Sequence, residues 1–147
     1  MNLYLRDISQ AYVQSTTLLN RDFYICPPYE LACCFALKDD QILKVVKPLY
    51  GVPEAGNHWF KTYHTHHVEQ LGMTQSTYDP CLLYSARPKP FGVVGLQTDD
   101  TLFLADDEFA RQEALQLQKA GFLAKEREKL TATNSLKFND GVIQMQP

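Results

Sequence analysis

The stretch GVVGLQTDDTLFLA, residues 92–105, determines the expected fold and much of the expected chemistry. Its two halves are short apolar runs rich in Val, Leu and Phe, which predicts two strands. The loop between them is tight, so Asp99 and Asp100 lie at or near a hairpin tip. Adjacent carboxylates repel each other unless a positive charge compensates, and Mg²⁺ prefers such oxygen ligands. A solvated, Asp-rich turn is the plain alternative, because Asp is common in hairpins.

A third carboxylate supports the metal interpretation. Residues 3–7 predict a strand that ends at Asp7, and a short helical turn follows it. A strand ending in Asp beside a hairpin with two Asp is what two-metal phosphoryl transfer needs. In that chemistry the carboxylates hold two Mg²⁺ ions about 3.5–4 Å apart, and the protein mainly positions charge and substrate.

Composition limits the class of protein. The chain has 147 residues, of which 45% are hydrophobic, with eight Tyr and eight Phe, so it is long and apolar enough for one domain with a core. No apolar run is long enough to span a bilayer, and Arg6 and Asp7 interrupt any signal peptide, so we expect an intracellular, non-secreted protein. The formal net charge of −3 argues against a stand-alone nucleic-acid binder but not against an enzyme whose carboxylates hold metals.

The four cysteines, Cys26, Cys33, Cys34 and Cys81, predict free thiols that are mostly buried. No secretory signal supports disulfides, and the absence of a C-x-x-C pair argues against a zinc ribbon.

The predicted elements follow one another in a simple order. They are a strand over 3–7, a strand over 23–26, a hairpin of 32–37 with 42–46, a helix from near Pro53 to Leu71 closed by Gly72, a strand over 81–85, the 92–105 hairpin, a helix over 109–120 capped by Asp106 and Asp107, and a hairpin over 136–145. Without the small insertions this is a βαββαβ pattern, an α+β fold with an antiparallel sheet and helices on one face. In that fold the first strand neighbours the hairpin, so Asp7 is expected beside Asp99 and Asp100.

Several other groups have structural interpretations. Helical spacing places Phe60, His64, Val68 and Leu71 on one face of the first long helix, and Ala110, Ala114, Leu117 and Gly121 on a narrow face of the second. Trp59 is expected in the core. The histidines His58, His64, His66 and His67 lack a partner that would complete a zinc site. The charged residues Lys119, Lys125, Glu126, Arg127, Glu128 and Lys129 alternate in sign and predict a solvated face.

Five stretches together resemble the reverse transcriptase domain of copia-type LTR retrotransposons. In chain order they are LRDISQAY (5–12), FYICPP (23–28), KPLYGVPEAGNHW (47–59), DPCL (79–82) and QTDD (97–100). Their order and spacing match that family along nearly the whole chain, and the last stretch stands where the family usually has Tyr-Val-Asp-Asp.

The resemblance implies an RNA-directed DNA polymerase whose palm is a single domain over residues 1–147, with the fingers, thumb and RNase H parts lying outside this polyprotein fragment. It implies Asp7, Asp99 and Asp100 as catalytic residues, with the carbonyl of Ile8 as a further ligand of two Mg²⁺ ions, for which Mn²⁺ can substitute. It also implies an RNA template, a DNA or RNA primer, dNTPs and other segments of the parent polyprotein as partners, with no membrane. The expected location is a cytoplasmic virus-like particle or the nucleus.

The same resemblance implies substrate-binding positions. Tyr12 occupies the place of the aromatic gate that excludes a ribose 2′-hydroxyl, although without the family a core Tyr would be the simpler interpretation. Gln97 replaces the usual Tyr before the two aspartates, and Glu54 replaces a Gln that touches nucleotide or template. A carboxylate is electrostatically unfavourable near a triphosphate, which argues against a nucleotide contact for Glu54.

Two rival hypotheses belong to other classes. The Glu54 change and the absent fingers fit a catalytically inactive, truncated relic of a retroelement with no enzymatic role. A nucleotidyl cyclase built on a similar fold would need a Gly-rich hairpin, which QTDD is not.

Overall fold

The computed structural model describes residues 1–38 and 40–146. Its centre is a six-stranded sheet in the order β4-β5-β6-β7-β1-β8, in which every neighbouring pair is antiparallel. The strands are β1 (Asn2–Asp7), β4 (Met73–Gln75), β5 (Leu82–Ser85), β6 (Gly92–Gln97), β7 (Asp100–Ala105) and β8 (Glu128–Lys129).

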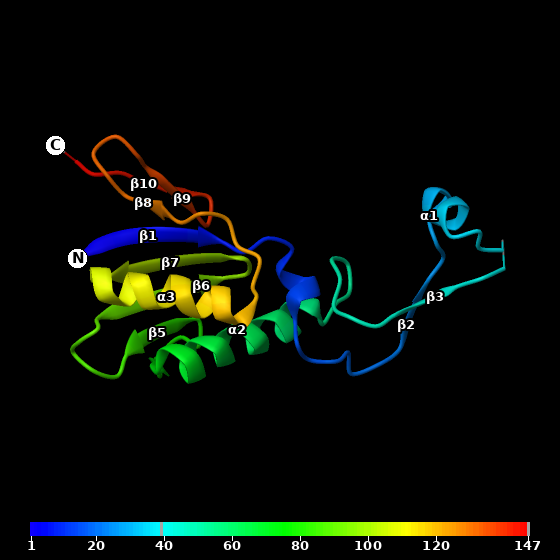
Figure 1. Ribbon diagram of the computed structural model, residues 1–147, viewed down its shortest axis with the longest axis horizontal. Helices are drawn as coiled ribbons and strands as arrows, with labels where there is room; N and C mark the ends of the chain where they lie inside the picture. The colour runs from blue at the N-terminus through cyan, green and yellow to red at the C-terminus, as the bar shows by residue number, and fades with distance from the viewer. Residues whose placement is uncertain (39, 147) are drawn as a thin grey trace.

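Two long helices, α2 (Ala55–Leu71) and α3 (Asp107–Ala120), lie against one face of this sheet (Figure 1). One core joins the three parts, with Phe103 from the sheet, Trp59 and Tyr63 from α2, and Phe109 from α3, all almost completely buried. The first four elements of the expected order, strand, helix, hairpin and helix, are present as β1, α2, β6–β7 and α3. The last strand was expected within residues 136–145, but the strand that pairs with β1 at the sheet edge is β8, and residues 136–143 form a separate hairpin. The α+β class, the antiparallel sheet and the placement of helices on one face are confirmed.

The ends of the helices follow local chemistry. Asp106 caps α3 by accepting a hydrogen bond from the amide of Phe109 at 2.8 Å, as predicted. Asp107 instead begins the helix, where a negative charge favours the positive end of the helix dipole. Gly72 ends α2 with a φ of 62°, a conformation that favours glycine.

The prediction of a hairpin over residues 32–46 was wrong. Residues 29–34 form the short helix α1 (Tyr29–Cys34), which starts directly after Pro28 and contains the helix formers Glu, Leu and Ala. The strand β3 (Leu43–Val45) pairs with β2 (Phe23–Ile25) instead, so the segment between them folds back as a helix. The turn predicted around Asp40 included Asp39, which lies outside the described residues.

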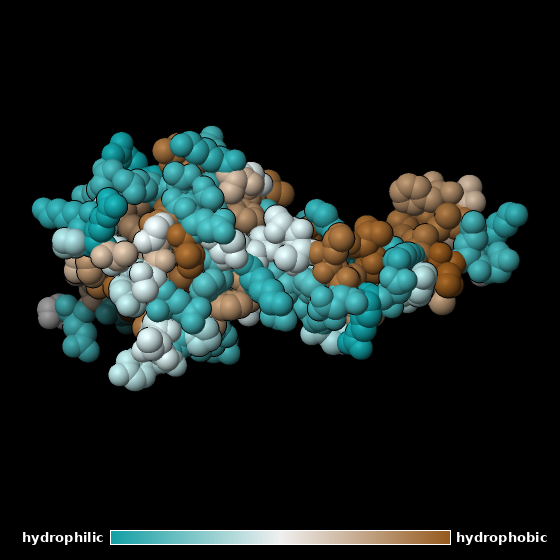
Figure 2. Space-filling view, turned by 90° about the horizontal axis from the view of Figure 1, so that it is seen from below, coloured by the Kyte–Doolittle hydropathy of each residue, from teal (hydrophilic) through white to brown (hydrophobic). Residues whose placement is uncertain are grey.

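Together β2, α1 and β3 form an arm that projects from the sheet at the end opposite both termini (Figure 1). None of the six residues of α1, all within the described chain, is buried, and Tyr29 and Phe35 are 80% and 69% exposed. In the space-filling view, brown patches of hydrophobic residues lie along the arm between hydrophilic ones (Figure 2). The arm thus has almost no core of its own, and a two-stranded sheet alone is only marginally stable.

The arm also explains why the cysteine prediction was only half right. All four cysteines are free, as predicted, but Cys26, Cys33 and Cys34 are exposed because they lie in the arm, and Cys81 is half-buried. The apolar sequence around them was interpreted as core, whereas its side chains face solvent.

The predicted face of Phe60, His64, Val68 and Leu71 coincides only in part with the buried side of α2, since Phe60 and Leu71 are half-buried against the core. Val68 is exposed, and the buried positions are Ala55, His58, Trp59, Thr62, Tyr63, His66 and His67. The helix carries buried histidines and a buried threonine on its inner side, so hydrophobic spacing alone favoured a neighbouring face. Trp59 is in the core, as expected.

The chain ends in a separate hairpin of β9 (Leu136–Phe138) and β10 (Gly141–Ile143). The hairpin predicted over 136–145 was expected to turn at Asp140-Gly141, but its two turn residues are Asn139 and Asp140, both with positive φ. Among the helices of the described residues, none combines the length and the apolar character that a membrane crossing requires.

Candidate active site

Strands β1 and β7 place Asp7 directly opposite Asp100. Facing residues on antiparallel strands have Cα atoms roughly 4.5–5.5 Å apart, so the two carboxylates share one spot on the sheet. Asp99 lies in the two-residue loop between β6 and β7, next to them. The expectation that the fold would bring Asp7 beside Asp99 and Asp100 is confirmed.

Alternation along the strands decides which face carries these carboxylates. Arg6 is buried and hydrogen-bonded to Glu113 of α3, and Thr101 is buried and hydrogen-bonded to Tyr63 of α2. Because neighbouring strand residues point to opposite faces, Asp7 and Asp100 lie on the face that the long helices leave open.

The loop that carries Asp99 is held from two sides. The amide of Ile8 donates to the Asp99 carbonyl at 2.8 Å, which joins the end of β1 to the hairpin. The indole N–H of Trp59 donates to the carbonyl of Thr98 at 2.6 Å. Thr98 has a φ of 52°, so the tight turn depends on an uncommon backbone conformation that these bonds support.

The site carries excess negative charge. Partial burial raises the pKa of Asp100 above its ordinary value, and the charges of Asp99 and Asp7 raise it further. One cation opposes this repulsion: the ammonium of Lys125 lies 2.7 Å from Oδ2 of Asp7. The hydrogen bond and the charge of Asp7 raise the pKa of Lys125 in turn.

The residue types fit a divalent metal, and their arrangement fits it in part. Asp7 and Asp100 face each other across the strands and Asp99 lies in the adjoining loop. Burial, and after it the charges of Asp99 and Asp7, raise the pKa of Asp100, and a divalent cation would oppose both effects. Within residues 1–38 and 40–146, however, no three His, Cys, Asp or Glu side chains already stand together as a metal-binding group. Lys125 occupies one oxygen of Asp7, so that ligand would have to be released first.

An aromatic cavity adjoins the hairpin tip. Tyr12, in the short 3₁₀ helix η1 (Ala11–Gln14), packs its ring against Tyr50 with centroids 4.4 Å apart. Tyr12 also lines a cavity of about 310 Å³ with Gln97, Thr98 and Trp59. Burial raises the pKa of Tyr50, and the charge of Asp99 raises it further. The structure therefore brings Tyr12 and Gln97 to one cavity next to the hairpin loop, although none of the three carboxylates lines that cavity.

Glu54 is occupied elsewhere. Its Oε1 accepts a hydrogen bond from the amide of Asn20 at 2.8 Å and lies 3.5 Å from Nε2 of His58, while Oε2 lies 3.7 Å from Nε of Arg21. These contacts fasten the base of the arm to the start of α2. They give Glu54 a structural role that its position in the sequence motif did not suggest.

Comparison with known proteins relates the chain to retrotransposon polyproteins. It is 24% identical over 119 residues to the truncated transposon Ty1-A Gag-Pol polyprotein of Saccharomyces cerevisiae, a match that covers 81% of this chain and 9% of that protein. The transposon Ty1-DR5 and Ty1-LR2 Gag-Pol polyproteins of the same yeast match at the same identity and coverage of this chain, and 6% of each is covered.

The chain thus spans less than a tenth of the length of these relatives. No protein-family profile matches it, and no solved structure does. The similarity supports an origin in a copia-type retrotransposon.

Sequence reasoning missed the cationic side of the site. Lys125 is exposed, as predicted, but it also pairs with Asp7. Arg127 is only half-exposed, and its guanidinium lies 4.8 Å from the ring centroid of Tyr4. Residues 124–129 return along the edge of β1, which only the tertiary structure reveals. Glu113 was missed as well, since a carboxylate on the inner face of a helix contradicts a hydrophobic pattern.

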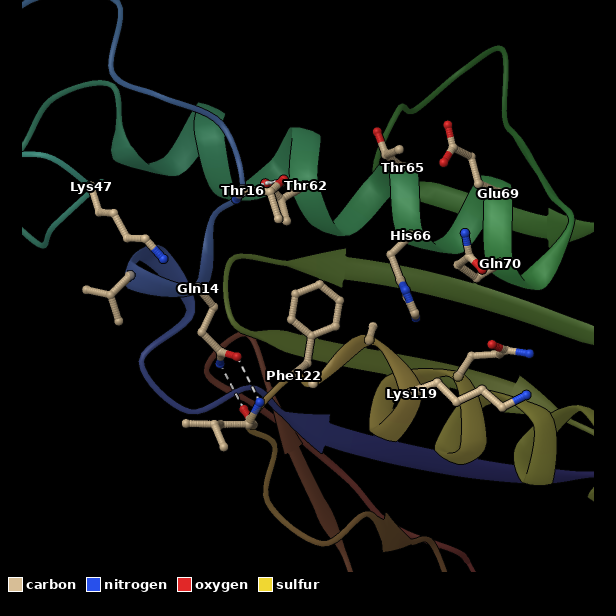
Figure 3. Close-up of a pocket in the computed structure, with 15 residues that line it drawn as sticks. Gln14, Thr16, Lys47, Thr62, Thr65, His66, Glu69, Gln70, Lys119 and Phe122 are labelled. Atoms are coloured by element: carbon tan, nitrogen blue, oxygen red, sulfur yellow. Dashed lines mark hydrogen bonds between the residues drawn. The ribbon is translucent and has the colours of Figure 1, made fainter.

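A larger groove, of about 940 Å³, lies on the helical side between α2, α3 and η1. Figure 3 shows His66 pointing into it and the amide of Gln14 bonded to the backbone of Leu123. Its lining mixes Lys47, Lys119 and Glu69 with glutamines and threonines. Its lining contains neither Asp7, Asp99 nor Asp100, so the volume of a groove does not identify the candidate site here.

Proposed function

We propose that this chain is the palm part of an RNA-directed DNA polymerase, a reverse transcriptase, of a copia-type retrotransposon. The observation that carries the proposal is the register of Asp7 against Asp100 on the sheet face opposite the long helices, with Asp99 in the adjoining loop. The similarity to Ty1 Gag-Pol polyproteins supports an origin in a retrotransposon. The proposed partners are an RNA template, a DNA or RNA primer, dNTPs and other segments of the parent polyprotein, in a virus-like particle or the nucleus.

In the proposed reaction the primer 3′-hydroxyl oxygen bonds to the α-phosphorus of a dNTP, and the bond from that phosphorus to pyrophosphate breaks. Asp7, Asp99 and Asp100, with the carbonyl of Ile8, are the groups that would hold two Mg²⁺ or Mn²⁺ ions. When bound, such ions polarise the attacking hydroxyl and neutralise the leaving phosphates. The protein residues supply the fixed negative charge and its position, and the bonds from Ile8 and Trp59 keep the loop in place.

Tyr12 is proposed to contact the sugar of the incoming nucleotide. Its ring is braced by Tyr50 and faces the cavity that it shares with Gln97, so it forms a rigid wall next to the hairpin loop. Gln97 is proposed to contact the primer end from the last position of β6. We do not extend a nucleotide contact to Glu54, because its oxygens already bind the base of the arm.

The test is primer extension on an RNA template by the full 147-residue chain, with Mg²⁺ and then Mn²⁺. The matched proteins are Asp99→Asn/Asp100→Asn, which removes two proposed ligands, and Asp40→Asn, which changes one distant carboxylate. We expect extension by the wild type and by Asp40→Asn, and at least a hundredfold loss in the double variant, the order expected when interactions made in the transition state are removed.

Extension that survives in Asp99→Asn/Asp100→Asn would contradict the assignment of the carboxylates. Absence of extension from every protein would reject the isolated chain as an enzyme and favour an inactive relic of the retroelement.

A further inference from the structure

Lys125 is the cation that meets the carboxylates of the candidate site. Its Nζ lies 2.7 Å from Oδ2 of Asp7, and the two side chains are 67% and 35% exposed. The ammonium therefore neutralises one of the proposed metal ligands while remaining open to solvent.

The backbone of Lys125 is held much more firmly than its side chain. Its amide donates to the carbonyl of Asp7 at 2.9 Å, and its carbonyl accepts from Nη1 of Arg6 at 3.1 Å. Arg6 is fixed in turn by two hydrogen bonds to buried Glu113, at 3.0 and 2.6 Å. Only the exposed end of Lys125 is free to change partner.

A groove beside the pair can receive the displaced ammonium. This groove, of about 370 Å³, is lined by Asp7, Asp100 and Lys125 and also by Glu126, Glu128 and Lys137. The two glutamates are further carboxylates in the same groove with which the ammonium of Lys125 could pair. Release of Asp7 therefore needs only side-chain rotation and leaves the backbone in place.

We propose that Lys125 is a tethered counter-ion that occupies Asp7 in the metal-free protein and is displaced when a divalent cation binds. This inference rests on the proposed metal site of the polymerase. A single ammonium neutralises one carboxylate and leaves Asp99 and Asp100 repelling each other, whereas a divalent ion can be shared by all three. Lys125 thus acts as a positioning residue that holds Asp7 toward the site and lowers the affinity of the empty site for metal.

The test measures Mn²⁺ binding to the full chain by the loss of the free-ion signal in electron paramagnetic resonance. Lys125→Gln removes the counter-ion, and Lys125→Arg keeps a cation there. Lys137→Gln is the matched control, because it removes one positive charge from the same groove and forms no ion pair among the described residues. We expect Lys125→Gln to bind Mn²⁺ roughly two- to fivefold more tightly than Lys137→Gln, the range that an exposed ion pair supports. Lys125→Arg should bind as the wild type does.

Equal Mn²⁺ affinities in Lys125→Gln and Lys137→Gln would overturn the inference, because the loss of any positive charge in the groove would then have the same effect. That result would leave the proposed metal site standing. Absence of saturable binding in all four proteins would reject the metal site and with it the role of Lys125. Weaker binding in Lys125→Gln would also overturn the inference, since Lys125 would then assist the metal.

Discussion

Gly92 of β6 packs directly against the ring of Phe109 in α3. A Cβ atom at this position would lie 2.7 Å from three atoms of the Phe109 ring, which is closer than packed atoms tolerate. At Gly95, on the same strand, the nearest atom outside the neighbouring residues is the carbonyl oxygen of Leu102 at 3.8 Å. The structure therefore has space for a methyl group at Gly95 but not at Gly92.

We expect Gly92→Ala to lower the free energy of unfolding by about 1–3 kcal/mol through overpacking, and Gly95→Ala to change it by less than about 0.5 kcal/mol. Urea denaturation followed by circular dichroism would measure both. Adding Phe109→Leu to Gly92→Ala should recover part of the loss, and equal effects at the two glycines would show that the ring is not the cause.

Single residues also show what sequence could and could not reveal about the site. Asp7, Asp99 and Asp100 could be predicted because each ends a recognisable strand or fills a hairpin tip. Lys125 could not, because it is 118 positions from Asp7 and lies in an irregular segment. Lys125 meets Asp7 because residues 124–129 run along the edge of β1, and no local sequence pattern encodes that path.

Between elements, a buried ion pair joins β1 to α3. Arg6 and Glu113 are 9% and 1% exposed at their side chains and form a two-bond contact. Removing one partner of a buried pair leaves an uncompensated charge in a poorly solvated place. On the outer face of the same helix, Glu108 and Arg111 form an exposed pair.

Glu113→Ala should therefore destabilise the protein by about 3–5 kcal/mol, while Glu108→Ala should cost less than about 1 kcal/mol. Thermal unfolding monitored by circular dichroism would compare the two. The combined change Arg6→Met/Glu113→Leu should restore most of the stability, because no charge is then left buried. A mild effect of Glu113→Ala would indicate that water reaches Arg6.

Elements with a strong periodic or capping signal could be predicted, and those set by tertiary contacts could not. The 92–105 hairpin, the capped helix after Asp106 and the helix closed by Gly72 all carry such signals. The segment at 29–34 was ambiguous because its short apolar run suits a strand or a helix. The inner face of α2 was misplaced because His66 and His67 take core positions that a hydrophobic pattern leaves to apolar residues.

Across the whole molecule, buried histidines link stability to pH. His67 is fully buried, and burial is the main reason that its pKa falls from 6.5 to about 4. Its Nδ1 lies 2.9 Å from the carbonyl of Tyr63, one turn earlier in α2. Because the unfolded chain binds this proton more tightly than the folded chain, stability is complete above pH 6.5 and is lost as the pH falls toward 4.

Between pH 7 and pH 5 this histidine should lower the free energy of unfolding by about 2 kcal/mol. Urea titrations at both pH values would measure the loss in the wild type. His67→Leu should reduce the difference substantially, whereas an unchanged difference would assign the pH dependence to other groups, His66 among them.

The bond between Trp59 and Thr98 has a practical consequence for spectroscopy. The chain contains a single tryptophan, and its indole N–H holds the carbonyl of the residue that precedes Asp99. Intrinsic fluorescence therefore arises from one fluorophore attached to the carboxylate loop. Any ligand that moves this loop should change the indole hydrogen bond and hence the emission, so unlabelled protein carries its own optical reporter of events at the three carboxylates.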